Sequence, residues 1–321
     1  MTTTTHDPAP RRAASPSGTV RLAEMVALPE QLLATAKDAP AHHVRVALDI
    51  RLRALLAHDP GVRTGQDVES VHQMRVSVRR MRAALKAARP LLDARWSDEL
   101  RAELGWLGRS LGPVRDLDVL LPRLRGLAAD LSEAEQDAAD QLVATFDAEY
   151  LVAREDMLAA LDAPRYTGLV ERLADAVRLP LPTRSATEGR PELVELVRAE
   201  YCSLRKAVKR AGPQPPDEVL HALRIKGKRL RYTGELAEPA LGRPVRRLLA
   251  ATAGLQEVLG DHQDACVAQE RIREVAFSGD HGAGVQFVAG RMVEREHVRA
   301  QHMRTLWWTA WCRVAAVGKE L

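Results

Sequence analysis

The chain has 321 residues, of which 46% are apolar, 28% charged and only 4% aromatic. Ala and Leu dominate the apolar set, so the composition favours an all-helical protein with a substantial core over a strand-rich fold. No apolar run approaches the roughly 18 residues of a membrane span, and a net charge of +4 does not by itself require a polyanionic partner.

The N-terminal segment is not expected to join the core. Residues 1–20 are rich in Thr, Pro, Ala, Ser and Gly, so we predict a disordered tail, without the apolar stretch of a secretory signal. A weak helix is expected over about 21–38, before Pro40. Three widely separated cysteines form no CxxC pair, which favours a reducing compartment and a cytoplasmic protein.

From residue 42 onward nearly the whole sequence has helical periodicity, without a convincing alternating strand. The segment 179–191 holds three prolines and a glycine, and we expect it to be a linker. We therefore predict one domain over 21–317, with a first half at about 40–178 and a second at about 192–315. The expected helices are 42–58, 67–89, 97–111, 115–128, 132–161, 165–178, 191–211, 217–237, 243–260, 262–277 and 285–315.

Two segments of the first half recur in the second. VHQMRVSVRRMR (71–82) aligns without a gap on LHALRIKGKRLR (220–231), 149 residues further on. LGRSLGPVRD (107–116) aligns on LQEVLGDHQD (255–264), 148 residues further on. Two matches at almost one offset predict an internal duplication, with two similar helical bundles that face each other across a pseudo-two-fold axis.

Each repeated unit contains a helix with a row of cations beside a row of apolar residues. Asp67 and Asp217 are expected to be the N-caps of these two helices. The windows 72–86 and 221–231 each carry five Lys or Arg and no carboxylate, so an anion is needed to offset the repulsion. At about 100° per residue, the cationic stripes are His72, Arg75, Arg79, Arg82 and Lys86, and His221, Arg224, Lys228 and Arg231.

The stripes favour a linear phosphate ligand. Arg presents forked donors that match phosphate oxygens, and a row over four turns fits a linear polyphosphate or a nucleic-acid backbone. Reading bases would require aromatic side chains among the cations. Only Tyr232 lies within or next to these windows, so the pattern indicates phosphate without bases.

These motifs resemble the CHAD family, the conserved-histidine α-helical domain. V-H-x-x-R-V-x-x-R-R-x-R-A-A-L at 71–85 and L-H-x-L-R-I-x-x-K-R-L-R-Y at 220–232 are similar to its two signatures. L-G-x-V-R-D-L-D-V at 111–119 and L-Q-x-V-L-G-D-x-x-D at 255–264 are similar to the motifs that follow them. The resemblance covers roughly 40–315. It implies two four-helix bundles related by pseudo-two-fold symmetry around a basic channel, binding of inorganic polyphosphate, and association with polyphosphate granules.

The resemblance also implies which residues bind. It transfers to the two histidines, to most cations of the stripes, and to Arg80 and Arg229, which lie beside them. Glu235 takes the place equivalent to Lys86 and could pair with a neighbouring cation or shorten the site. The predicted polyphosphate-binding residues are His72, Arg75, Arg79, Arg80, Arg82, Lys86, His221, Arg224, Lys226, Lys228, Arg229 and Arg231. Secondary candidates on the preceding helices are Arg53, Arg198, Arg205 and Lys209.

The sequence contains no phosphate-binding glycine loop, no carboxylate pair among the cations and no nucleophile motif. We therefore expect a binding protein without enzymatic activity or cofactor.

The repeated Asp116 and Asp264 are expected to orient an Arg of the basic helices. His72 and His221 could donate to phosphate oxygens or bond a backbone carbonyl. No metal site is expected at Asp261, His262, Asp264 and Cys266. Of these four possible ligands, only Asp264 has a matching residue, Asp116, at the equivalent position of the first half.

Three alternatives remain open. The same cations could bind RNA without sequence preference, although nucleic acid is expected only as a weaker competitor of polyphosphate. The protein could be a phosphohydrolase of polyphosphate or of a nucleoside triphosphate. It could also dock an acidic protein, for example one associated with polyphosphate granules, but no membrane partner is expected.

Overall fold

The structure is a computed structural model that describes residues 22, 26–65, 67–183, 192–278 and 281–320. The predicted disordered tail, residues 1–20, lies outside the described residues, as do residues 184–191 of the predicted linker. Residues 179–183 of that segment are described and are not helical.

The described part of the chain is all-α, as the composition predicts, and its one strand-like pairing is an isolated bridge between Leu92 and Thr183. None of its helices combines the length and the hydropathy that crossing a bilayer would require. The helices are α2 (Pro40–Thr64), α3 (Val68–Ala87), α4 (Ala94–Ala129), α5 (Glu133–Asp162), α6 (Pro164–Arg178), α7 (Leu193–Ala211), α8 (Asp217–Leu241), α9 (Arg243–Ser278), α10 (Ala283–Val317) and the 3-10 turn η1 (Gly318–Glu320).

The weak helix expected up to residue 38 is wrong for residues 27–39, which form no helix. Side chains of α2 hold this segment instead. The backbone N–H of Leu32 donates to Asp49 Oδ2 at 2.8 Å, and the guanidinium of Arg53 donates to the carbonyl of Pro29. These two contacts hold the segment against α2 in a non-helical conformation.

Helices α4 and α9 are longer than predicted. The breaks expected after residue 111 and after residue 260 are both wrong, because α4 continues through Pro113 and Pro122 and α9 continues through Gly260. Each of these helices packs in one core at its beginning and in a second core at its end. The gain from burial at both ends outweighs the local cost of a proline or glycine within the helix.

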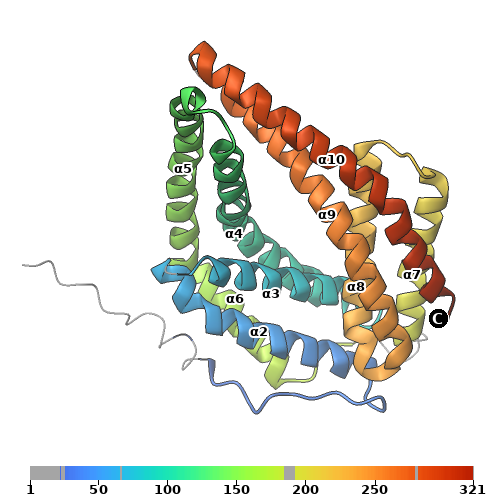
Figure 1. Ribbon diagram of the computed structural model, residues 1–321. Helices are drawn as coiled ribbons and strands as arrows, with labels where there is room; N and C mark the ends of the chain where they lie inside the picture. The colour runs from blue at the N-terminus through green and yellow to red at the C-terminus, as the bar shows by residue number, and fades with distance from the viewer. Residues whose placement is uncertain (1–21, 23–25, 66, 184–191, 279–280, 321) are drawn as a thin grey trace, which may run out of the picture.

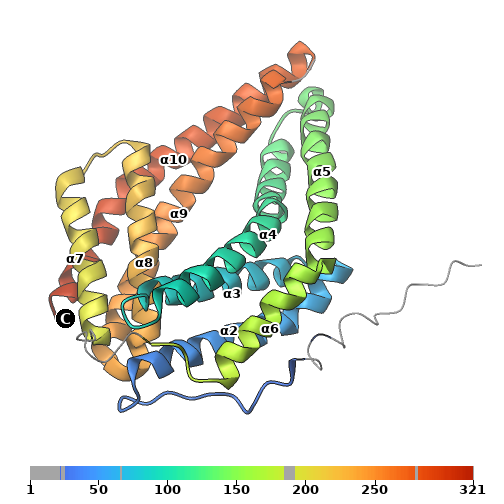
Figure 2. The same ribbon diagram turned by 180° about the vertical axis from the view of Figure 1, so that it is seen from behind.

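The two halves of the chain share both cores. One core gathers residues from α2 to α10 at the base, and the other joins the end of α4 and the start of α5 to the end of α9 and the start of α10. Figures 1 and 2 show the result: α4 with α5, and α9 with α10, rise as two arms whose tips lie together. The helices of the basic stripes, α3 and α8, lie at the foot of these arms.

The N-caps of α3 and α8 differ. Asp67 is the N-cap of α3 as predicted, and its side chain accepts from the backbone N–H of Glu69 at 2.9 Å. In the second half the N-cap is Pro216, so the expectation for Asp217 is wrong. Asp217 is the first residue of α8, and its carboxylate bonds to Arg304 and His262 instead.

Candidate functional site

A basic groove lies between the two halves, where α3 and α4 face α8 and α9, and has a cavity volume of about 360 Å³. This matches the groove that the sequence predicts between the repeated units. Six Arg or Lys side chains and only two carboxylates line it. The cations of the lining are Arg75, Arg79, Arg115, Arg123, Arg224 and Lys228, and the imidazoles of His72 and His221 lie among them.

On the first side of the groove, an aspartate of α4 holds Arg75 of α3. The guanidinium of Arg75 lies 3.2 Å from a carboxylate oxygen of Asp116. To reach it, Arg75 crosses α4 at Gly112, where a Cβ atom would lie only 2.7 Å from Arg75 Nη1. Gly112 therefore lets the guanidinium pass close to the backbone of α4, and a side chain at this position would push Arg75 aside.

On the second side, α8 and α9 repeat this arrangement. The guanidinium of Arg224 lies 3.7 Å from a carboxylate oxygen of Asp264, and Gly260 of α9 lies beside it. The prediction that Asp116 and Asp264 each contact an arginine of a basic helix is thus confirmed. The internal duplication itself stays a prediction, although the two halves use equivalent residues here.

The concentration of positive charge changes the acidity of the groove. Burial, together with the nearby guanidinium groups of Arg224 and Arg79, lowers the pKa of Lys228 to about 8. Burial also lowers the pKa of Arg224, and burial with the charge of Arg115 lowers the pKa of His72. Each shift disfavours the cation, so a bound anion would relieve the repulsion.

Two arginines of α4, which the sequence analysis missed, also line the groove. Arg115 and Arg123 are eight residues apart and share a face with Val119 between them. Arg123 also donates to the buried Glu296 of α10 through Nε at 2.6 Å, which ties the two arms together. The four-residue spacing of these positions is a signal that the sequence contains.

Three predicted cations of α3 lie outside the groove. Arg80 pairs with Glu235 of α8 at 3.3 Å. Arg101 of α4 lies beside Arg82 and also near Lys86. The stripe is longer than the groove, so its second half meets other surfaces.

Three predicted cations of α8 also lie elsewhere. Lys226 donates to Ser203 Oγ of α7 at 2.9 Å. Arg229 lies near Lys86. Arg231 pairs with Glu235 at 3.0 Å, which bears out the first of the two roles considered for Glu235.

None of the four secondary candidates lines the groove among the described residues. Arg53 pairs with Asp49 within α2 at 2.8 Å. Arg198, Arg205 and Lys209 are exposed on α7, where Arg205 lies over the ring of Tyr201.

The two histidines both line the groove, at the N-terminal end of each stripe. His221 Nδ1 lies 2.5 Å from Oε1 of Gln263 on α9, so this ring is oriented by a side chain and not by a backbone carbonyl. With one nitrogen held by Gln263, the other nitrogen of His221 is the one that can face a ligand.

Comparisons with known proteins agree with this architecture. The family model described as CHAD domain matches residues 46–273. Uncharacterized proteins from two strains of Mycobacterium tuberculosis are 30% identical over 276 residues, which cover 83% of this chain and 52% of theirs. The chain thus spans about half the length of the curated relatives it matches.

Two solved structures are similar in fold. The CHAD domain from the plant Ricinus communis superposes with a TM-score of 0.69 at 27% identity, over 89% of this chain and 95% of that one. PptA from Streptomyces chartreusis superposes with a TM-score of 0.68 at 19% identity, over 84% of this chain and 98% of that one.

Proposed function

The chain belongs to the CHAD domain family, and from this premise we propose that its basic groove binds inorganic polyphosphate. The observation that carries the proposal is the charge of the lining, in which six Arg or Lys from both halves face two carboxylates. Arg forks and the Lys ammonium supply donors for phosphoryl oxygens along a chain.

The lining favours phosphate without bases. Among the described residues that line the groove, none is Phe, Tyr or Trp, so there is no platform on which a base could stack. Tyr232 lies near the groove but contacts Arg79, whose guanidinium lies 5.9 Å from the centre of the ring. RNA is therefore expected to compete only weakly.

We further propose that the groove binds without turnover. Asp116 and Asp264 each contact an arginine. A carboxylate held by a guanidinium is poorly placed to act as a general base. Binding of this kind would serve to place the protein on polyphosphate granules in the cytoplasm.

The test is calorimetric titration with medium-chain polyphosphate at two salt concentrations. The variant replaces Arg75, Arg79 and Arg224 by Ala. Three lost charge-assisted contacts of about 1.5 kcal/mol each would weaken binding about a thousandfold. The slope of the logarithm of affinity against the logarithm of salt concentration should also become shallower by about two, by analogy with single-stranded nucleic acid.

The matched control removes three exposed cations outside the groove, Lys206, Arg243 and Arg273. It has the same net charge as the first variant, and its affinity should stay within a few fold of the wild type. Equal loss in both variants would show a non-specific effect of charge. RNA that displaces polyphosphate, or phosphate release with magnesium that is lost in the groove variant, would favour the alternative functions.

A further inference from the structure

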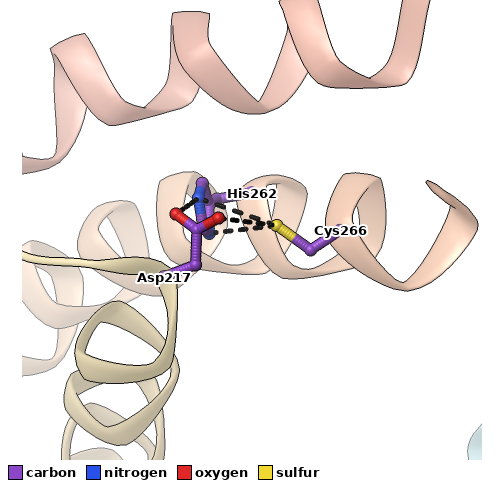
Figure 3. A group of neighbouring side chains, drawn as sticks. All are labelled: Asp217, His262 and Cys266. Atoms are coloured by element: carbon purple, nitrogen blue, oxygen red, sulfur yellow. Dashed lines mark hydrogen bonds and ion pairs between the residues drawn. The ribbon is translucent and has the colours of Figure 1, made fainter. Parts of the chain in front are cut away.

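Asp217, His262 and Cys266 meet where α8 begins against α9, next to the basic groove but outside its lining (Figure 3). His262 Nε2 lies 3.1 Å from Asp217 Oδ1, and Cys266 Sγ lies 3.8 Å from His262 Nε2 and 3.9 Å from Asp217 Oδ2. Three different ligand types therefore converge on one point. We propose that these three residues form a zinc site.

The spacing of the three atoms fits zinc. Zn–N and Zn–O bonds of about 2.0 Å and a Zn–S bond of about 2.3 Å in tetrahedral geometry place ligand atoms roughly 3.2–3.8 Å apart. The 3.1 Å between His262 Nε2 and Asp217 Oδ1 and the 3.8 Å between His262 Nε2 and Cys266 Sγ lie close to this range, and one ligand atom from each of the three residues lies within 4.8 Å of the others. A thiolate with an imidazole selects zinc over magnesium or calcium, which prefer oxygen ligands only.

Each ligand is held in place by the fold. His262 is only 2% exposed, and its spacing of four residues from Cys266 puts both side chains on one face of α9. Arg304 of α10 donates to Asp217 and, through Nη2 at 2.6 Å, to the carbonyl of Pro215, so it orients the carboxylate from outside. The side chain of Asp217 is 49% exposed, which leaves an entry path for the ion.

The alternative role of a reactive cysteine is disfavoured. Burial and the carboxylate of Asp217 raise the pKa of the Cys266 thiol to about 11, so the metal-free thiol is protonated and a poor nucleophile. Bound zinc would replace that proton and join the start of α8 to α9. The zinc site would lie one turn before His221 in α8 and would include the neighbour of Gln263 in α9, and both His221 and Gln263 line the groove.

The site is tested on the full chain without a tag, stripped with a chelator and kept reduced by a phosphine. Titration with Co²⁺ should give one equivalent with tetrahedral visible bands and a near-ultraviolet thiolate band, and Zn²⁺ should displace it. Cys266→Ser should remove the thiolate band. It should also weaken Zn²⁺ binding by at least the roughly 10–100-fold that loss of an outer-sphere partner causes.

The matched control is Cys312→Ser, which changes an exposed cysteine on α10 and should keep both signals. Zn²⁺ should raise the unfolding midpoint of the wild type and of this control but not of Cys266→Ser. The proposal is overturned if Zn²⁺ does not bind stoichiometrically, or if Cys266→Ser binds it as the wild type does. Polyphosphate affinity is measured separately, so failure here leaves the proposed function untouched.

Discussion

Lys228 shows how the groove changes the chemistry of one side chain. The same residue type on an open helix face keeps its ordinary pKa, whereas here burial and the charges of Arg224 and Arg79 lower it to about 8. Near neutral pH the ammonium is still charged, but the neighbouring guanidinium groups repel it. A polyanion in the groove would restore a favourable environment and raise this pKa again.

We therefore expect polyphosphate affinity to depend on pH through Lys228. The free pKa is about 8 and the bound pKa is higher, so binding takes up a proton between these two values. Affinity should be greatest below pH 8 and fall by up to about tenfold per pH unit above it. Calorimetry over this range checks the slope. In Lys228→Arg the cation cannot titrate, so an unchanged slope in that variant would contradict the assignment.

Gly112→Ala tests the crossing of Arg75 over α4. A Cβ atom at this position would lie 2.7 Å from Arg75 Nη1, so the flexible guanidinium must move away from Asp116. Stability should not fall, because Ala is favoured over Gly in a helix by about 1 kcal/mol. Polyphosphate affinity should fall about tenfold, as for one weakened charged contact.

Gly126→Ala is the control for this change, because a Cβ atom at position 126 of α4 would meet nothing within 4 Å. It should gain the same helix propensity without any loss of affinity. If Gly112→Ala binds polyphosphate as tightly as this control, the position of Arg75 does not matter for binding.

At the scale of elements, each basic stripe divides between different neighbours. The first half of α3 directs Arg75 and Arg79 into the groove, whereas Arg82 and Lys86 meet cations of other helices. Helical periodicity places all four on one face. It does not say how far along that face the partner helices extend.

The continuity of α4 leads to a prediction about Pro113. This proline is exposed within the helix, where it cannot donate a backbone hydrogen bond. Pro113→Ala should therefore raise the free energy of unfolding by about 1–3 kcal/mol in denaturant titrations.

Pro164→Ala is the comparison, because this proline begins α6, where no helical hydrogen bond is lost. Its effect should be small. A destabilised Pro113→Ala variant would instead mean that the proline maintains a bend that α4 needs in order to reach both cores.

At the scale of the whole molecule, the groove exists because two cores hold the halves together. The second core joins the tips of α4 and α5 to α9 and α10, and the pair of Arg123 with Glu296 crosses between the same arms. Glu296 is only 2% exposed, so the carboxylate depends on Arg123 for its charge balance.

Removing this carboxylate should destabilise the fold. Glu296→Ala leaves Arg123 without its partner, and breaking a buried ion pair from one side costs about 3–5 kcal/mol. Glu294→Ala, an exposed position on the same helix, should change the free energy of unfolding by less than about 0.5 kcal/mol. Similar small effects in both variants would show that the pair does not hold the arms together.

The sequence by itself determined the helical class, most helix positions, the two basic stripes and the two aspartates that contact them. These depend on local periodicity, composition and repeated motifs, which the chain carries without knowledge of its neighbours. It also led to the CHAD family, because four ordered motifs are read directly from the residues.

Only the tertiary structure decided which cations share the groove, and it added Arg115 and Arg123 of α4 to them. It also joined the expected helix pairs into α4 and α9, because burial in two cores outweighs local breakers. Asp217 came beside His262 and Cys266 across 45 residues of sequence in the same way. Convergence of this kind depends on how helices pack, and spacing along the chain does not encode it.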